Sequence, residues 1–262
     1  DLMQLPLTFA ERLSQASDPQ VGLWVCSGSA TCAELIVGAQ PDWVLIDGEH
    51  SPIGLESTLG LLHTVAAYGA TPVVRVPECD TARIKQFLDL GAQNIMVPMV
   101  HDASIAASAV SAMHYPPKGV RGVGSALARS SRWNRVPDYL AIASETVSLT
   151  VQIESTEGVR NAEAIAAIEG VDAVFIGPAD LAADMGYLGQ QDHPEVISSV
   201  LDTIDAVRAA GTRVGVNAFA FAQQQMYLDA GVDFIAVGAD VQLLAKASSD
   251  LVRNTRALSK KD

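Results

Sequence analysis

The sequence predicts an α/β protein folded as a (β/α)8 TIM barrel. Two observations point to this fold class. Short apolar stretches of strand length alternate with helical patterns along the 262 residues, and glycines close several helices immediately before the next strand. Eight such units in about 250 residues is the size of this barrel. A doubly wound open sheet is the structural alternative, but it has an edge strand and usually fewer repeats.

Each element follows from its local pattern. A short amphipathic helix is expected over Leu7–Ala16. Eight strands are then expected, at Val21–Ser27, Trp43–Asp47, Pro72–Val76, Ile95–Val100, Leu149–Ile153, Ala173–Ile176, Val214–Asn217 and Phe234–Val237. Helical periodicity between them is clear at Thr81–Leu90, which ends before Gly91, and at Glu157–Ile168, which ends before Gly170.

A long segment at about residues 115–137 separates the fourth and fifth strands. Loops of this length in compact domains are usually functional or interfacial. No Pro/Ser/Gly-rich spacer or charged block divides the chain, so we expect a single domain over residues 1–262. Basic residues in the long segment predict a local positive rim for anionic substrates. They are Arg121, Arg129, Arg132 and Arg135.

The composition limits the class of partner and the location. A formal net charge of −13 argues against nucleic acid or an anionic membrane, because both require clustered Lys and Arg. The expected partner is a small molecule. Cys26, Cys32 and Cys79 are an odd number of cysteines, which predicts free, buried thiols in a reducing, cytoplasmic setting. No signal sequence and no run of about 20 apolar residues is apparent, so no membrane span is expected.

Polar residues gather where the predicted strands end. The second strand ends in Asp47, Glu49 and His50, and the third ends in Arg75. The remaining members are Gln152 and Glu154 after the fifth strand, Gly177–Asp180 after the sixth and Asn217 at the end of the seventh. The C-terminal ends of barrel strands form the active face. We therefore expect these side chains to converge in one site.

Glu154 and Asp180 are the candidate metal ligands, because adjacent strands of a barrel lie about 5 Å apart and two carboxylates at their ends can share a cation. No cluster of Cys and His accompanies them. Hard oxygen ligands favour Mg2+, Mn2+ or a similar divalent ion such as Co2+ over a tetrahedral zinc site. A charge near the helix N-terminus at Ser155 is the structural alternative for Glu154.

His50 is the best candidate general base, since imidazole titrates near neutrality and Asp47 and Glu49 stand beside it. His63, His114 and His193, in helical or loop stretches, are interpreted as structural, whereas His101, after the fourth strand, could line the mouth of the site. Arg75 ends an apolar strand, so it either pairs with a carboxylate of the site or binds an anionic substrate. The turn at Gly177–Leu181 presents free backbone N–H groups that suit a substrate carboxylate, with a plain structural turn as the alternative.

Two absences narrow the chemistry. No lysine ends a predicted strand, so a Schiff-base aldolase would lack its nucleophile. The lysines are Lys85, Lys118, Lys246, Lys260 and Lys261. The segments after the seventh and eighth strands lack a glycine-rich phosphate loop, so an unphosphorylated substrate is expected.

Six segments carry a resemblance to a known family: Asp47–His50, Pro72–Arg75, Val97–Val100, Arg121–Arg129, Val151–Glu154 and Phe175–Leu181. They resemble the HpcH/HpaI aldolase family, the metal-dependent pyruvate aldolases typified by 4-hydroxy-2-oxoheptanedioate aldolase. The resemblance runs from about Val21 to about Leu251. It implies that Glu154 and Asp180 hold the metal, with Gln152 beside them.

The resemblance also implies roles in substrate binding and proton transfer. The backbone amides of Ala179 and Asp180 would hold the carboxylate of pyruvate, and Arg75 would lie at its enolate oxygen. His50 would be the base, paired with Asp47. Family members form hexamers in which a carboxylate of a neighbouring subunit supports this histidine. Asp89 stands at the corresponding position, although an exposed aspartate at a helix end is the ordinary alternative.

The predicted function is an aldol reaction that makes or cleaves 4-hydroxy-2-oxo acids through a metal enolate of pyruvate, or of hydroxypyruvate, and an aldehyde. His50 would remove the proton through a bound water, while Arg75 and the metal stabilise the enolate. Decarboxylation of a 2-oxo diacid such as oxaloacetate needs the same enolate and is the main alternative. A non-catalytic sugar-acid-binding barrel is the other. The sequence does not predict the aldehyde, the stereochemistry or the preferred metal.

Overall fold

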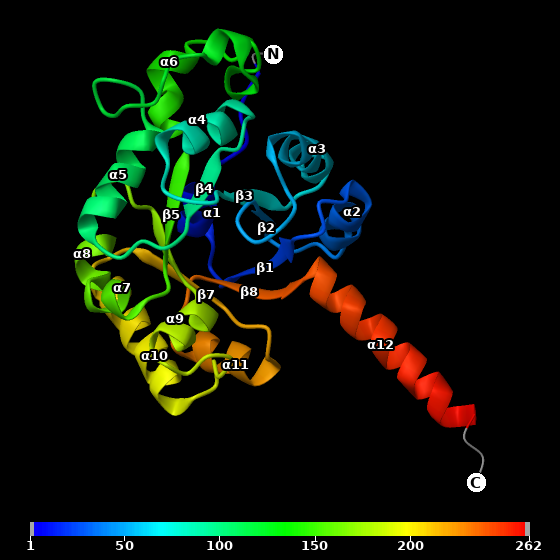
Figure 1. The fold of residues 1–262 in the computed structure, drawn as a ribbon. Coiled ribbons are helices and arrows are strands. Elements are labelled where there is room, and N and C mark those ends of the chain that lie inside the picture. Colours follow the sequence, from blue (N-terminus) through cyan, green and yellow to red (C-terminus); the bar gives the residue numbers. More distant parts are fainter. Residues whose placement is uncertain (1–2, 260–262) are drawn as a thin grey trace.

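A closed barrel of eight parallel strands, arranged in sequence order, forms the centre of the molecule (Figure 1). The computed structural model describes residues 3–259; residues 1–2 and 260–262, at the ends of the expected domain, lie outside the described part. The strands are β1 (Gln20–Val25), β2 (Trp43–Asp47), β3 (Thr71–Arg75), β4 (Asn94–Val97), β5 (Ser148–Ile153), β6 (Ala173–Ile176), β7 (Arg213–Asn217) and β8 (Phe234–Ala239). The predicted (β/α)8 fold is confirmed.

Helices alternate with the strands and cover the barrel. They are α1 (Phe9–Gln15), α2 (Ala30–Gly38), α3 (Leu55–Val65), α4 (Thr81–Asp89), α5 (Ala103–Met113), α6 (Tyr139–Ile142), α7 (Thr156–Arg160), α8 (Ala162–Ala166), α9 (Pro178–Asp184), α10 (Pro194–Ala209), α11 (Phe221–Asp229) and α12 (Asp240–Ser259). Short polar side chains fix several starting points by accepting a backbone N–H of the first turn. These caps are Thr8, Ser29, Asp80, Asp102 and Ser155.

One predicted helix is wrong as a single element. The pattern over Glu157–Ile168 forms two short helices, α7 and α8, that meet at Asn161. Asn161 has φ −99° and ψ 5°, and its side-chain Nδ2 donates to the carbonyl oxygen of His101 at 2.8 Å. This long-range bond holds the backbone out of helical geometry, and periodicity cannot reveal it.

The inside of the barrel is packed with large aromatic side chains. Trp43, Phe175 and Phe234 contact one another, and Phe9 of α1 closes the end where the strands begin. Gly22 of β1 makes room for this packing, because a Cβ there would collide with the Trp43 ring. The interior is therefore a solid core rather than a channel, and the site can form only at its ends.

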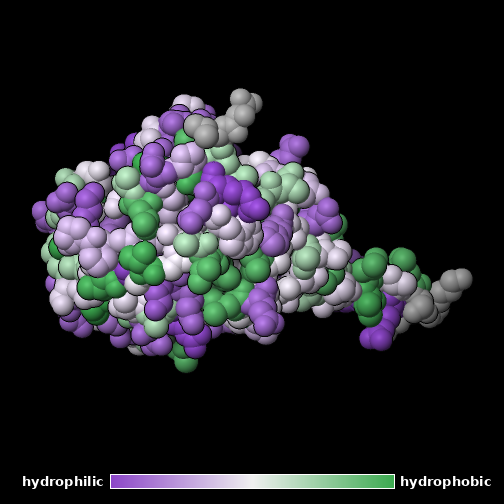
Figure 2. Space-filling view, turned by 90° about the horizontal axis from the view of Figure 1, so that it is seen from above, coloured by the Kyte–Doolittle hydropathy of each residue, from purple (hydrophilic) through white to green (hydrophobic). Residues whose placement is uncertain are grey.

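The final helix, α12, leaves the barrel and projects away from it (Figure 1). Asp240 at its start is buried and accepts hydrogen bonds from the backbone N–H groups of Cys26 and Ser27. Beyond this anchor, apolar side chains of α12 remain exposed, as Figure 2 shows. They are Val241, Leu243, Leu244, Leu251, Val252 and Leu258. Within residues 3–259, neither α12 nor any other helix is long and apolar enough to cross a membrane.

The long segment at 115–137 packs on the C-terminal end of α4, at the end of the barrel where the strands begin. Arg121 is 1% exposed and its Nη2 donates to Asp89 at 2.9 Å. Arg129 donates to the carbonyl oxygen of Leu90 at 3.0 Å. The expected positive rim for substrates is therefore wrong within this chain, because Arg121 is buried in an ion pair and Arg129 faces away from the strand C-termini.

Candidate active site

A buried ion pair links the C-terminal ends of β2 and β3. Asp47 and Arg75 stand directly opposite each other in the register of the two strands. Their side chains are only 2% and 4% exposed, and Arg75 Nε donates to Asp47 Oδ1 at 2.9 Å. The two strand ends therefore place this pair without any contribution from a mobile loop.

Asp47 also organises the chain that follows it. Its Oδ1 accepts from the backbone N–H groups of Glu49 at 3.1 Å and His50 at 3.4 Å, and its Oδ2 accepts from Ser51 Oγ at 2.9 Å. Burial alone would raise the pKa of Asp47, but the hydrogen bond and charge of Arg75, with these further donors, hold it below its ordinary value. Asp47 is thus an ionised anchor for the turn that carries Glu49 and His50.

Arg75 contacts residues from three other strand ends of the site. Its Nη1 lies 2.7 Å from Glu49 Oε2 and donates to Gln152 Oε1 at 3.4 Å. Its Cζ lies 4.5 Å from the centre of the Trp24 ring. Burial raises the pKa of Glu49, and the charges of Asp47 and Asp180 raise it further against the opposing charge of Arg75. The single positive charge of Arg75 therefore stands among more negative charge than it can neutralise.

Glu154 follows β5 and is 2% exposed. Its Oε1 accepts from Met99 N at 2.8 Å and its Oε2 accepts from Gln152 Nε2 at 2.6 Å. Burial raises the pKa of Glu154 to about 7, with a further contribution from the charge of Asp180. Gly177 allows this arrangement, since a Cβ there would lie 2.6 Å from Glu154 Oε2. The carboxylate is fixed in place before any ligand arrives.

Ala179 and Asp180 lie in the first turn of α9, which begins at Pro178 directly after β6 and Gly177. Both residues are exposed. Their backbone N–H groups precede the first intrahelical donor, Leu181, and point out of the helix end. The structure thus brings the β6 turn beside Glu154.

The residues fit a divalent cation. Within residues 3–259, no cluster of three or more His, Cys, Asp and Glu side chains could hold a metal by itself. The site instead offers Glu154 and Asp180, whose charges interact, with Glu49 close enough to raise the pKa of Glu154 as well. Excess carboxylate charge around one arginine is the donor chemistry of a hard cation completed by water and substrate.

His50 stands at the rim of the site with its side chain 67% exposed, and its Nε2 lies 3.7 Å from Glu49 Oε1. Asp47 bonds to the backbone of His50, and no contact joins it to the ring. Asp89 is not part of this cluster: it ends α4, at the opposite end of the barrel, and pairs with Arg121. Within one chain, the imidazole is therefore near Glu49 and far from Asp89.

The structure adds contacts around the site that the sequence did not reveal. The Trp24 ring supports the Arg75 guanidinium and contacts Phe219 edge to face at 6.5 Å. Cys26 lies on the same strand end, where burial raises the pKa of its thiol to about 11, so it stays protonated. His101 Nδ1 and Ser155 Oγ are 2.8 Å apart. Strand alternation could have indicated that Trp24 points inward, but only the fold shows its contact with Arg75.

Comparisons with known proteins agree with this geometry. The model of the HpcH/HpaI aldolase/citrate lyase family matches residues 20–247. The chain is 48% identical over 249 residues to the hydroxypyruvate/pyruvate aldolase of Pseudomonas aeruginosa, over 95% of this chain and 93% of that protein. It is 48% identical over 237 residues to the 4-hydroxy-2-oxo-heptane-1,7-dioate aldolase of Salmonella paratyphi A, over 90% of each.

A solved structure gives the same result for the fold. The HpcH/HpaI aldolase/citrate lyase family protein of Burkholderia cenocepacia J2315 superposes with a TM-score of 0.90 at 38% identity. The superposition covers 94% of this chain and 98% of that one. The likeness therefore extends over the whole barrel and includes the strand ends that carry the site.

Asp47→Asn is expected to lower the free energy of unfolding by about 2 kcal/mol near pH 7, because Arg75 loses a buried charged partner. The folded state holds the pKa of Asp47 below 3.8. The contribution is therefore complete above that value and is lost as the pH falls through the folded pKa. Denaturant unfolding of both proteins between about pH 7 and pH 3 measures this difference. Asp18→Asn, at an exposed carboxylate, is the control, and a gap that does not shrink with acid would contradict the assignment.

Proposed function

The chain belongs to the HpcH/HpaI aldolase/citrate lyase family, and we propose that it is a pyruvate-type aldolase, a carbon–carbon lyase that makes or cleaves 4-hydroxy-2-oxo acids. The observation that carries this proposal is the buried Arg75 between Asp47 and Glu49, beside the fixed carboxylate of Glu154. One relative is named a hydroxypyruvate/pyruvate aldolase and the other a 4-hydroxy-2-oxo-heptane-1,7-dioate aldolase. The 2-oxo acid of this enzyme is accordingly pyruvate or hydroxypyruvate, and its second substrate is an aldehyde.

A divalent cation would be held by Glu154 and Asp180, with Gln152 adjacent through its hydrogen bond to Glu154. Mg2+, Mn2+ and Co2+ all suit such an oxygen donor set. When bound, the cation polarises the 2-oxo group and makes the adjoining carbon more acidic. Gln152 keeps Glu154 oriented, so its role is to position the ligand rather than to react.

The substrate carboxylate would bind at the turn after β6. The backbone N–H groups of Ala179 and Asp180 are directed out of the start of α9, where the helix end favours an anion. Arg75 would donate to the 2-oxo oxygen as negative charge develops on it. Because Arg75 is buried and already held by Asp47, this donor needs no reorganisation during the reaction.

His50 would act as the general base that removes the proton from the carbon next to the 2-oxo group, through a water molecule. Its exposed ring can reach the space above the strand ends, and Glu49 lies near enough to stabilise its charged form. Asp47 positions His50 by holding its backbone N–H. Asp89 would support the imidazole only from a second copy of the chain, because its own barrel separates it from His50.

The assembly that we propose is a homohexamer. The exposed apolar side chains of α12 support self-association, because a helix that projects from its own barrel with leucines in solvent needs a partner surface (Figure 2). The position of Asp89, remote from its own His50, is also consistent with a site that two copies complete.

Metal-dependent release of pyruvate tests the function. We expect release from a panel of 4-hydroxy-2-oxo acids to stop with chelator, to return with Mg2+ or Mn2+, and to fall at least about 100-fold in Glu154→Gln. Coupled oxidation of NADH measures the rate. Glu163→Gln, at an exposed glutamate of α8, should retain full activity. Chelator-resistant release would overturn the metal assignment, and decarboxylation of oxaloacetate without any aldol cleavage would favour the alternative function.

Proton exchange at the methyl group of pyruvate isolates the base. His50→Ala is expected to slow this exchange by about 100-fold or more, since the proton then has no acceptor, while the affinity for Mn2+ stays unchanged. Deuterium uptake followed by proton NMR measures the rate. His63→Ala, at an exposed histidine of α3, is the matched control. Unchanged exchange in His50→Ala would assign proton removal to another group.

The role of α12 is tested by placing negative charges on its exposed apolar side. Leu244→Glu combined with Leu251→Glu is expected to convert the assembly into smaller species, because buried carboxylates at a subunit contact are costly. Light scattering after size-exclusion chromatography measures the mass. Leu188→Glu changes an equally exposed leucine away from α12 and should leave the mass unchanged. A hexamer that survives the double substitution would exclude this helix from the contact.

A further inference from the structure

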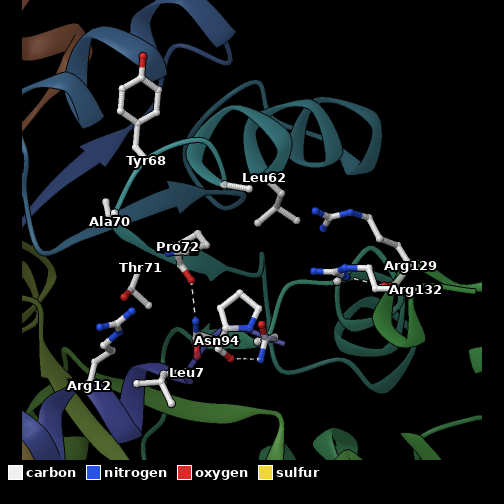
Figure 3. Close-up of a pocket in the computed structure, with 15 residues that line it drawn as sticks. Leu7, Arg12, Leu62, Tyr68, Ala70, Thr71, Pro72, Asn94, Arg129 and Arg132 are labelled. Atoms are coloured by element: carbon white, nitrogen blue, oxygen red, sulfur yellow. Dashed lines mark hydrogen bonds between the residues drawn. The ribbon is translucent and has the colours of Figure 1, made fainter. Parts of the chain in front are cut away.

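A cavity lies at the end of the barrel opposite the candidate active site, where β3 and β4 begin (Figure 3). Its volume is about 180 Å3. Its walls are α1, the end of α3, the turn after α4, and the 3-10 helix η2 (Arg129–Ser131) with the residue that follows it. Thr71 and Asn94, the first residues of β3 and β4, lie on its floor. The aldol chemistry proposed above uses none of these residues.

The charged side chains around the cavity are all cationic. Arg129 and Arg132 extend into it side by side from the long segment, and Arg12 rises toward Thr71 from α1 (Figure 3). Among residues 3–259, no Asp or Glu lines the cavity. This is unexpected in a chain with 30 acidic and 17 basic residues.

Two of these guanidinium groups are held close together. The position that a Cβ would occupy on Gly91 lies 2.7 Å from Arg129 Nη1 and 2.9 Å from Arg132 Nη1. Gly91 has φ +86°, a backbone conformation that favours glycine, and its lack of a side chain leaves room for both Nη1 atoms. Burial lowers the pKa of both arginines, and the charge of Arg132 lowers that of Arg129 further.

Neither guanidinium has a counter-ion within residues 3–259. Arg129 Nη1 donates to the carbonyl oxygen of Leu90 at 3.0 Å, and Arg132 Nη1 donates to that of Arg129 at 2.6 Å. Each guanidinium has five N–H donors, so most of the donors on both groups have no protein acceptor. A purely structural role for the pair would need only the two carbonyl contacts and would not need a cavity in front of them.

We propose that this cavity is a binding site for a small oxyanion. Two adjacent forked donors match the oxygens of a sulfate-like or phosphate-like oxyanion, or a carboxylate. Thr71, Asn94 and Gln93 line the remaining wall, where the side-chain amides of Asn94 and Gln93 donate to backbone carbonyl oxygens. The volume admits an inorganic oxyanion or a short dicarboxylate and is too small for a nucleotide. A carboxylate presented by a second copy of the chain would satisfy the same chemistry.

Sulfate is the probe, because it stays doubly charged over the whole working pH range. Isothermal titration of the full-length protein with sodium sulfate, at ionic strength matched with sodium chloride, is expected to show saturable binding with one site per chain. Arg129→Gln and Arg132→Gln should each weaken the binding at least tenfold. Arg135→Gln, at an exposed arginine of the same segment that stacks on Trp133, should bind as the wild type does.

Circular dichroism and thermal unfolding without sulfate show whether each variant is folded. If Arg129→Gln does not fold, Arg129→Lys, which keeps the positive charge, takes its place. Light scattering on the same samples separates the two sources of the anion. Sulfate binding that the variants lose at constant mass supports a free anion. No sulfate binding, together with dissociation of the variants, supports a carboxylate from a second copy. No binding and no change in mass, or binding that neither substitution weakens, would overturn the proposal.

Discussion

The ion pair between Asp47 and Arg75 is the constraint on which the candidate active site depends. Both side chains are almost completely removed from water, so neither can be neutralised by solvent, and each must be matched within the protein. Asp47 then fixes the turn that carries Glu49 and His50, while Arg75 reaches across the barrel to Gln152. In the proposed reaction, Arg75 would respond to a change in the charge of the substrate. A guanidinium locked by a strand register can do so without moving.

Much of the fold and of this site could be predicted from the sequence, because both follow from local rules. Alternating apolar strands and glycine-closed helices specify the barrel, and the barrel sends residues at strand ends to one face. Asp47, Arg75, Glu154 and Asp180 could be grouped in advance for this reason. The roles of these residues in catalysis remain a proposal, and the structure contributes their distances, burial and partners.

The features that could not be predicted depend on contacts between distant segments. Periodicity gave no sign that Asn161 would bond to His101 and divide a helix. The spacing of the arginines in the long segment does not show which end of the barrel they will reach. In the structure, Arg129 and Arg132 lie at the end opposite the candidate active site. The helical pattern of α12 does not indicate that the helix projects from the barrel, because an amphipathic helix can pack on its own barrel or on another chain.

The bond from Asp240 to the amides of Cys26 and Ser27 joins residues more than 200 positions apart. It ties the end of β8 to the end of β1, beside the strand pairing that closes the barrel and near Trp24, which supports the guanidinium of Arg75. During synthesis on the ribosome, this closure cannot occur until nearly the whole chain has emerged. Until then, the early strands have an apolar edge that is not paired with another strand. A chain of this topology therefore exposes apolar surface to aggregation for longer than a protein with local contacts does.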